Sequence, residues 1–294
     1  MPFRHVLLAL LVVAIWGFNF VVIKMSVDAM PPLFAASLRF FCAAGPAVFF
    51  VKPPKAPFWL VVTFGLFFGF ALYSFLNLSL YLGMPAGLAS LVLQVQAFFT
   101  MFFAFFVLKE RPRLQQIVGA LVAFGGIGVI AMERMQATSL TPLLLTVAAA
   151  AAWGVANVLT KKAGRVNTVA LTVWGALAAP LPLLVLSYFV EGPEAIGHAV
   201  SNFGWNDAAL IAFLAYPATT MCGIIWAWLL GRHSASTVAS FTLLVPVFGL
   251  VSGALVLGET ITTIEIAGAV LVLIGLMITV LRRRPNATVG IVAE

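Results

Sequence analysis

The amino-acid sequence predicts an all-α integral membrane protein, in which ten transmembrane helices form two inverted five-helix repeats around a central cavity. Apolar residues make up 63% of the 294 residues, charged residues make up 9%, and the mean hydropathy is +1.13. A soluble protein has about 45–50% apolar and about 25% charged residues, so lipid must solvate most of this chain. The other two observations are an internal repeat and the odd number of apolar segments in each copy.

The repeat is visible as two pairs of matching stretches. Ala14–Lys24 recurs as Ala151–Lys161, 137 positions later, and Leu108–Gly126 recurs as Leu257–Gly275, 149 positions later. Self-similarity at this scale has to be interpreted before any other feature. It divides the chain into a first repeat, residues 1–135, a second repeat, residues 136–284, and a short tail, residues 285–294, that we expect to be disordered.

Each transmembrane helix needs about 20 apolar residues to cross the hydrocarbon core of a bilayer. Division of the chain at charges, prolines and polar clusters gives ten such segments, joined by short connections of which the longest lies near residues 191–206. The predicted spans are residues 5–23, 32–51, 58–80, 86–108, 114–132, 141–161, 168–190, 206–230, 235–257 and 262–281.

The orientation of these spans follows from their basic residues, which gather in the cytoplasmic connections of membrane proteins. With the N-terminus inside, only Lys24 and Arg134 lie outside, and both chain ends are cytoplasmic. The cytoplasmic residues are Arg4, Lys52, Lys55, Lys109, Arg111, Arg113, Lys161, Lys162, Arg165, Arg232 and Arg282–Arg284. This distribution explains the net charge of +7, and such helices cannot form the basic face that binds nucleic acid.

Five spans are an odd number, so the second repeat enters the membrane upside down relative to the first. Lys24 ends its helix outside, whereas its counterpart Lys161 ends inside. Inverted repeats are typical of secondary transporters, whose substrate site lies near the midplane between the halves. One chain then completes one pathway, so a monomer suffices.

Two tryptophans lie about half-way through their spans rather than at a membrane interface. Trp16 precedes Asn19 by three residues, and Trp153 precedes Asn157 by four, so each pair shares a helix face. A buried amide needs a partner, because an unsatisfied one in hydrocarbon costs several kcal/mol. The amides therefore either join neighbouring helices or face a wet cavity, and their occurrence in both repeats favours the cavity.

Further polar and aromatic candidates lie in later spans. Tyr73, Asn77 and Tyr81 are spaced four apart on one face, which is either a cavity wall or a packed seam. Gln94 lies in the fourth span, and Trp226 follows the polar residues of the eighth.

The substrate class is limited by what the spans contain. No Asp or Glu lies deep in any predicted span, and Arg39 is the one basic residue within a span. Arg39 either meets an anionic group or pairs structurally with a carbonyl or a loop acid such as Asp28. Aromatic rings, amides and hydroxyls suit a neutral or zwitterionic small molecule with an apolar side. Cys42 and Cys222 offer no metal-ligand spacing, so we expect no metal and no cofactor.

Three function classes remain to be compared. A membrane-embedded enzyme needs a nucleophile with its base, paired aspartates or a His-rich zinc site, and the sequence has none of these. A transporter working as a facilitator without proton coupling fits the absence of a buried carboxylate. An exporter of another neutral or cationic metabolite or drug, and a receptor or scaffold that transports nothing, stay open as alternatives.

The two WGxN and WGxxN openings, the pattern of Pro32–Phe40 and the LKER and LGET helix ends resemble the EamA family of the drug/metabolite transporter superfamily. The helices QIVGALVAFGGIGVI and EIAGAVLVLIGLMI that follow are similar too, so the resemblance covers nearly the whole chain. Within that family the chain is most similar to the YddG-type exporters of aromatic and other amino acids.

This resemblance implies ten helices with both ends in the cytoplasm, a central cavity, and export of amino acid-like metabolites through the bacterial inner membrane. Lys109 departs from the family's usual glycine before the glutamate, which we expect to affect the helix end and not the substrate. The implied cavity residues are Trp16, Asn19, Tyr73, Asn77, Tyr81, Gln94, Trp153, Asn157 and Trp226.

Overall fold

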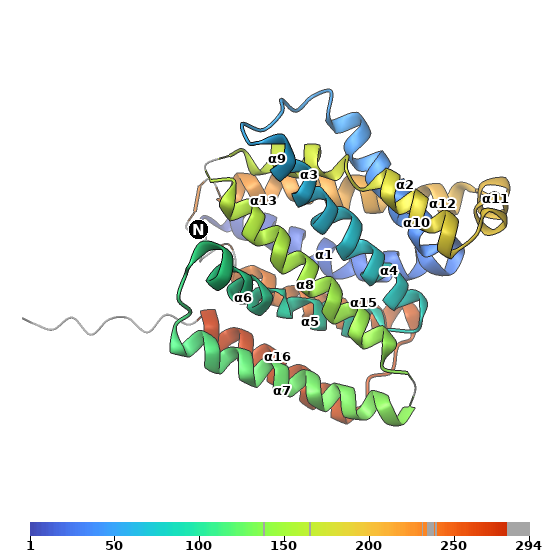
Figure 1. Ribbon diagram of the computed structural model, residues 1–294. Helices are drawn as coiled ribbons and strands as arrows, with labels where there is room; N and C mark the ends of the chain where they lie inside the picture. Colours follow the sequence, from blue (N-terminus) through green and yellow to red (C-terminus); the bar gives the residue numbers. More distant parts are fainter. Residues whose placement is uncertain (138, 165, 231, 234–237, 239, 281–294) are drawn as a thin grey trace, which may run out of the picture.

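Helices joined by short connections form the regular structure of the part of the chain that can be described. The computed structural model describes residues 1–137, 139–164, 166–230, 232–233, 238 and 240–280, and no strand occurs among them. Figure 1 shows the helices as a layered bundle. The predicted tail, residues 285–294, lies outside the described residues.

Four helices of the first half begin directly after a proline, at Pro2, Pro31, Pro57 and Pro85, and in the second of these Pro32 also occupies the first helical turn. These helices are α1 (Phe3–Ala29), α2 (Pro32–Ala47), α3 (Phe58–Gly65), η1 (Leu66–Ala71), α4 (Leu72–Tyr81), α5 (Ala86–Val92), η2 (Leu93–Val95), α6 (Gln96–Leu108) and α7 (Leu114–Ala137).

The second half follows a similar order. Asn167 caps α9 by accepting hydrogen bonds from the backbone of residues 169 and 170, and Thr262 and Glu265 form a reciprocal cap on α16. These helices are α8 (Thr141–Lys162), α9 (Thr168–Ala176), α10 (Pro180–Val190), α11 (Pro193–Ser201), α12 (Trp205–Ala215), η3 (Tyr216–Met221), α13 (Cys222–Leu230), η4 (Ser240–Leu244), α15 (Val245–Leu257) and α16 (Thr263–Val280).

Seven helical stretches of the described residues are long and apolar enough to cross a membrane. They are Phe3–Ala29, Phe58–Tyr81, Ala86–Leu108, Leu114–Glu133, Thr141–Lys162, Thr168–Val190 and Trp205–Leu229.

The other three predicted spans, 32–51, 235–257 and 262–281, correspond to shorter helices. The 16 residues of α2 rise only about 24 Å, less than the ~30 Å of a hydrocarbon core. The predicted span 235–257 begins among residues outside the described part of the chain.

The structure differs in two places from the prediction of continuous spans joined by connections without helices. The span 168–190 breaks between α9 and α10, because Pro180 and Pro182 have no N–H to donate to the preceding helical turn. The long connection after α10 folds into the short helix α11, in which no residue is buried.

Several elements recur in the two halves in the same order. The six-residue π-helices η1 and η3 each continue into an α-helix, and the 13-residue helices α6 and α15 each follow a 3₁₀ turn. Both α6 and α15 end at a residue with a left-handed backbone, Lys109 with φ 58° and Gly258 with φ 65°. Lys109 thus ends α6 with nearly the same backbone conformation that Gly258 adopts at the end of α15.

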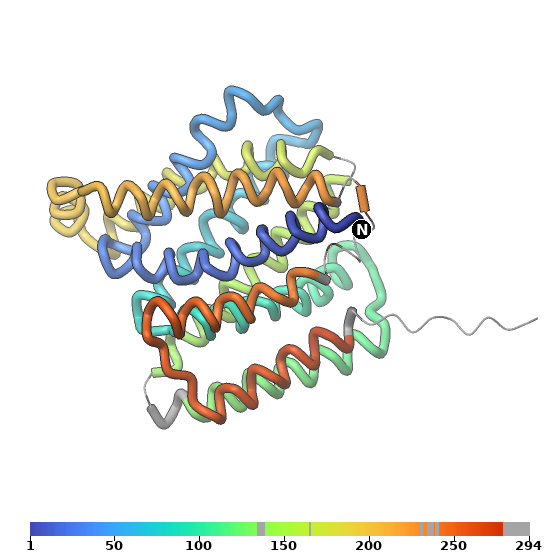
Figure 2. Tube along the Cα trace, turned by 180° about the vertical axis from the view of Figure 1, so that it is seen from behind, coloured from blue at the N-terminus to red at the C-terminus, as the bar shows by residue number. Residues whose placement is uncertain are grey.

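Helices α7 and α16 lie side by side at one edge of the bundle, as both views show (Figures 1 and 2). A Cβ atom on Gly126 would lie 2.6 Å from the carbonyl oxygen of Gly268, and one on Gly275 would lie 2.5 Å from that of Gly119. The later residue of α7, Gly126, contacts the earlier residue of α16, Gly268, and the earlier Gly119 contacts the later Gly275. The two helices therefore run antiparallel.

The bundle has two distinct ends. The N-terminus and the connection from α6 to α7 lie at one end, on the left in Figure 1, which we call the N-terminal end. The connection from α15 to α16 and the helix α11 lie at the other, which we call the opposite end.

Candidate functional site

Two tryptophans, one from each half of the chain, meet inside the bundle. The ring centroids of Trp16 on α1 and Trp226 on α13 are 5.0 Å apart, with an interplanar angle of 54°. The indole N–H of Trp16 donates a hydrogen bond of 3.1 Å to the carbonyl oxygen of Ala218 in η3. Both tryptophans were predicted cavity residues, and the structure brings them together.

The helical segment that Trp16 binds, η3, is a π-helix with a proline in its first turn. Pro217 has no N–H, so the regular α-helical ladder cannot continue through this turn. Thr219 and Thr220 instead donate their hydroxyls to carbonyls five residues earlier, those of Leu214 and Ala215, at 2.7 and 3.0 Å. Single π turns of this kind are frequent at functional sites.

Arg39 on α2 binds Thr219, which directly follows the Ala218 that Trp16 binds. Its Nε and Nη2 atoms lie 3.3 and 3.0 Å from the hydroxyl oxygen of Thr219, and its guanidinium carbon lies 4.3 Å from the centroid of the Tyr73 ring. The side chain is 3% exposed, and its Nη1 atom is buried without a hydrogen-bond partner. Arg39, Trp16, Tyr73 and η3 form what we call the central cluster.

The structural partner of Arg39 was not the one that the sequence favoured. Asp28, the loop acid considered for it, pairs instead with Lys24, with a distance of 2.6 Å between Nζ and Oδ1. The i, i+4 spacing of Lys24 and Asp28 on one helix explains this choice. The Thr219 hydroxyl therefore takes the place expected for a carbonyl or a carboxylate.

Three further first-half candidates lie on α1 and α4, the helices of Trp16 and Tyr73. Asn19 is 7% exposed, and its Oδ1 atom is buried without a partner. Asn77 donates from Nδ2 to the carbonyl oxygen of Pro32 at 2.9 Å, which ties α4 to the start of α2. Tyr81 ends α4 and is 56% exposed, so it does not lie in the cluster.

The candidates Asn157 and Gln94 join helices at other places. Asn157 Nδ2 on α8 donates to Gln96 Oε1 and Thr100 Oγ1 of α6, at 2.7 and 3.0 Å, and Gln94 Nε2 donates to the carbonyl oxygen of Thr242 at 3.0 Å. Trp153 is partly buried against the main hydrophobic core. These three residues do not contact the Trp16–Trp226 pair in any interaction that the structure shows, and each stays a predicted cavity residue.

Two glutamates of the second half cap helices of the first half at the opposite end of the bundle. Glu259 accepts hydrogen bonds from the backbone N–H groups of Ala86 and Gly87, at 2.5 and 3.0 Å, and so caps α5. Glu191 in the same way caps α2, accepting from Leu33 and Phe34 at 2.7 and 3.2 Å. A carboxylate at a helix N-terminus satisfies free N–H groups and the helix dipole together.

Glu110 is the residue of the first half that corresponds to Glu259, and it has a different partner. Both carboxylate oxygens of Glu110 lie 2.5 Å from Nζ of Lys161. A hollow of about 220 Å³ opens beside this pair at the N-terminal end, and its wall includes Thr100, which binds Asn157. Polar groups thus continue from the N-terminal end toward the bundle interior.

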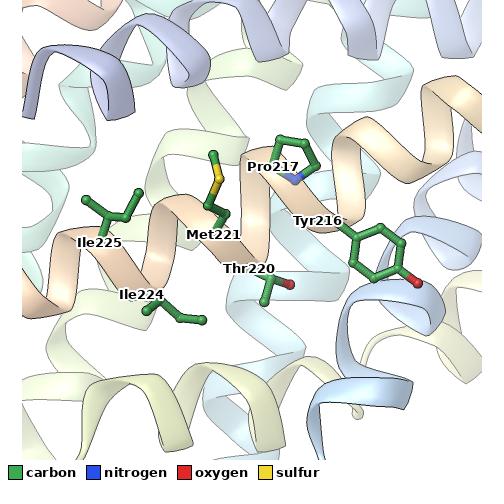
Figure 3. A pocket seen from close by; sticks show the side chains of 6 residues that line it. All are labelled: Tyr216, Pro217, Thr220, Met221, Ile224 and Ile225. Atoms are coloured by element: carbon green, nitrogen blue, oxygen red, sulfur yellow. The ribbon is translucent and has the colours of Figure 1, made fainter. Parts of the chain in front are cut away.

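A second hollow, of about 360 Å³, lies along η3 and α13 (Figure 3). Its wall comes from one helical stretch alone and is mostly apolar: Tyr216, Pro217, Thr220, Met221, Ile224 and Ile225. Tyr216 and Ile224 are 46% and 52% exposed. Since the stretch Trp205–Leu229 is apolar enough to span a membrane, lipid would cover this face, and we assign no ligand to it.

Metal-binding chemistry has no visible basis in the described ranges. No group of three or more His, Cys, Asp or Glu side chains lies close enough there to hold a metal ion. The two histidines at the N-terminal end, His5 and His233, contact each other instead, with 2.7 Å between Nδ1 and Nε2.

Comparison with known proteins places both halves of the chain in one family. Residues 3–132 and residues 140–281 each match the EamA-like transporter family. A crystal structure that is 19% identical in sequence superimposes with a TM-score of 0.65 over 97% of this chain and 99% of that one, which shows a shared fold.

Several full-length relatives have names that describe export. A protein of Salmonella typhimurium (strain LT2), named "Probable amino-acid metabolite efflux pump", is 43% identical over 96% of both chains. Its namesake in Escherichia coli (strain K12) is 42% identical over 96% of this chain and 97% of its own. A "Probable terminal-alkyne amino-acid exporter" of Streptantibioticus cattleyicolor is 26% identical over 95% of this chain and 96% of its own. The chain therefore belongs to the EamA-like transporter family and is a multi-pass membrane transporter, not an enzyme.

Proposed function

We propose that this protein exports amino acids, aromatic and other apolar ones among them, or related small metabolites across the bacterial inner membrane by alternating access. The central cluster carries this proposal. The Trp16 indole and the Arg39 guanidinium bind neighbouring residues of one π-helix there, and the guanidinium lies over the Tyr73 ring, so that the cluster can hold a molecule with an apolar side and a charged end. The names of the 43% and 42% identical relatives support amino-acid metabolites as the substrate class.

In this proposal the chain spans the membrane ten times, as two inverted repeats of residues 1–135 and 136–284, with both ends in the cytoplasm. The antiparallel contact of α7 with α16 supports an inverted arrangement, because the glycines concerned are repeat equivalents of each other. Gly119 and Gly126 correspond to Gly268 and Gly275. The excess of Lys and Arg at the N-terminal end supports a cytoplasmic location for that end. The central cluster already combines both halves within one chain, which supports a monomer.

The unequal partners of Glu110 and Glu259 support alternating access. Glu259 joins the connection after α15 to α5 and so closes the opposite end, which in this topology is the outside. Glu110 has left the equivalent position to pair with Lys161, beside the hollow at the cytoplasmic end. In the other main state, Glu110 would cap a helix start and Glu259 would release one. The present structure then corresponds to the inward-facing state.

We also propose that transport follows the substrate gradient without proton coupling. Carriers coupled to protons commonly use a carboxylate inside the membrane. In the described part of the chain, Glu265 is the buried acid, and it serves as a cap in the first turn of α16. Such a position at a helix end is not that of a proton carrier at the midplane.

The test is counterflow of labelled phenylalanine in proteoliposomes, competed by a panel of amino acids, nucleosides and organic cations, with and without a pH gradient. We expect competition by aromatic and large apolar amino acids, and a rate that Trp16→Ala lowers about two- to tenfold, since an aromatic contact contributes about 0.5–1.5 kcal/mol beyond its area burial. Trp59→Ala is the matched control, because Trp59 is 53% exposed.

Three results would contradict parts of the proposal. Flux that strictly follows the pH gradient would rule out the facilitator. Competition by organic cations alone would replace amino acids with another substrate class. Binding of phenylalanine without any movement across a sealed bilayer would favour a receptor.

A further inference from the structure

The guanidinium group of Arg39 is buried with neutral partners only. Its contacts are the Thr219 hydroxyl and the face of the Tyr73 ring, and none of the described acids forms an ion pair with it. Its Nη1 atom donates to nothing. A buried charge is strongly unfavourable unless it is paired and its N–H groups are satisfied. The side chain is 3% exposed, so bulk water does not compensate it in this conformation.

The group that fits such a guanidinium is a carboxylate. Arginine presents a rigid planar fork of N–H donors, which matches the two oxygens of a carboxylate and forms short, charge-assisted hydrogen bonds. The Thr219 hydroxyl occupies two of these donors, Nε and Nη2, as a single neutral acceptor. An arriving carboxylate can take over this fork together with Nη1, since the hydroxyl also has a bond of its own to the carbonyl oxygen of Leu214.

Asn19 has the complementary deficiency. Its Oδ1 atom is a buried acceptor that receives no hydrogen bond. Asn19 lies one turn along α1 from Trp16, about 5 Å away along the helix axis. Trp16 in turn binds Ala218, the residue before the Thr219 that Arg39 binds. Arg39 thus has a donor without an acceptor and Asn19 an acceptor without a donor, and the two residues are connected through Trp16 and the neighbouring residues Ala218 and Thr219 of η3.

We infer that Arg39 binds the carboxylate of the transported molecule and that Asn19 accepts hydrogen bonds from its ammonium group, so that the site selects zwitterionic α-amino acids. This inference rests on the proposed function. Arg39 and Asn19 belong to the first half of the chain, and η3 belongs to the second. Separation of the two halves therefore opens the space between η3 and these two residues to substrate. The Trp16–Trp226 pair then lies where the apolar side chain of the amino acid enters.

The test compares phenylalanine with three analogues as competitors of labelled phenylalanine counterflow in proteoliposomes. Phenylalaninamide and phenethylamine lack the carboxylate, and 3-phenylpropionate lacks the ammonium group. For the wild type we expect each analogue to compete at least about 50-fold more weakly, since a site built to hydrogen-bond a group strongly rejects the analogue without it.

Variants assign the two roles. Arg39→Gln should reduce the preference for phenylalanine over phenylalaninamide to less than about threefold, while Arg39→Lys keeps part of it because the charge remains. Asn19→Leu should remove the preference over 3-phenylpropionate alone. Lys55→Gln, in the connection between α2 and α3, is the control for loss of one positive charge. Size-exclusion profiles verify folding, and if Arg39→Gln does not fold, Arg39→Lys and the wild-type panel decide.

The outcomes separate this inference from the proposed function. Wild-type protein that transports phenylalanine but accepts phenylalaninamide equally well would overturn the inference and leave the proposed function standing. Arg39→Gln with full discrimination against the amide would overturn the assignment of Arg39. Wild-type protein that moves no amino acid at all would overturn both.

Discussion

Lys109 and Gly258 end equivalent helices with nearly the same left-handed backbone, at φ values of 58° and 65°. In both cases the next residue is a glutamate, whose N–H bonds back to the carbonyl oxygen of Ala104 in the first half and of Gly253 in the second. Lysine is one of the residues that this conformation disfavours, because its Cβ lies too close to the backbone. The helix end has kept its geometry although its glycine is absent from the first half.

Replacement of Lys109 by Gly should therefore stabilise the protein by about 1 kcal/mol, the strain of one left-handed residue with a side chain. For a chain of this size we expect a rise in the melting temperature of about 2 °C. Gly258→Ala should have the opposite effect of similar size. Lys109→Ala is the control, since it removes the charge but keeps the strain. If Lys109→Ala stabilises as much as Lys109→Gly, the effect comes from the charge and not from the backbone.

Loss of the Glu259 carboxylate should open the end of the bundle that it closes. Removal of a helix cap costs about 1–2 kcal/mol, which corresponds to roughly tenfold in the open population. We would introduce Ser90→Cys, a fully buried position on α5, into protein without Cys42 and Cys222, and measure its labelling by a membrane-impermeant thiol reagent. Glu259→Ala should raise the labelling rate about tenfold.

The control for this experiment is Glu194→Ala, which removes an acid from the exposed helix α11. Equal labelling rates in the Glu259→Ala and Glu194→Ala proteins would mean that the cap on α5 does not hold this end closed.

Gly125 and Gly126 are neighbours on α7 but should respond differently to a single methyl group. A Cβ atom on Gly126 would lie 2.6 Å from a backbone oxygen of α16, whereas one on Gly125 would meet nothing within 4 Å. Overpacking of this kind costs about 1–3 kcal/mol, because backbone atoms cannot move aside cheaply. Gly126→Ala should lower the melting temperature by several degrees, and Gly125→Ala should not. Similar losses in both variants would show that helix propensity or lipid contact dominates.

The contact between His5 and His233 should make the N-terminal end sensitive to acid. Partial desolvation lowers the pKa of His233, and the positive charges of His5, the N-terminus and Arg232 lower it further. The folded protein therefore favours neutral His233, and this contribution to stability is lost as the pH falls from the ordinary histidine value of about 6.5 toward the lowered one.

We expect His233→Gln to reduce the difference between the melting temperatures at pH 5.5 and pH 7.5. His198→Gln, on exposed α11, serves as the control and should leave that difference unchanged. An unchanged difference in the His233→Gln protein would remove His233 as the source of the acid sensitivity.

Much of the helical architecture could be predicted from the sequence, because composition and repetition do not depend on how helices rotate. The apolar character of the spans and the similarity of the two halves are of this kind. The division of the seventh span was harder to predict. Prolines in membrane helices can kink, start or interrupt a helix, and only the packed structure shows that Pro180 starts α10.

The contacts of the central cluster could be predicted from the sequence only in part. Trp16 was predicted as a cavity residue from its type and position, and Trp226 from the family resemblance, yet Thr219 was not identified as the partner of Arg39. A π turn changes the direction of every side chain that follows it by about 100° relative to a continuous α-helix. The contact across 180 positions of the chain depends on that rotation, which no periodicity of the sequence reveals.

The two π-helices also bear on the evolutionary origin of the chain. A π turn accommodates one residue more than the α-helical turn that it replaces, and η1 and η3 occupy matching places in the two halves. A single insertion that preceded the duplication accounts for both, whereas two later events would have had to reach the same turn independently. The bulge is then older than the fused chain. If the halves are the inverted five-helix repeats proposed above, the ancestral five-helix protein would already have carried it, and two separate subunits would have had to assemble in opposite orientations to make one pathway.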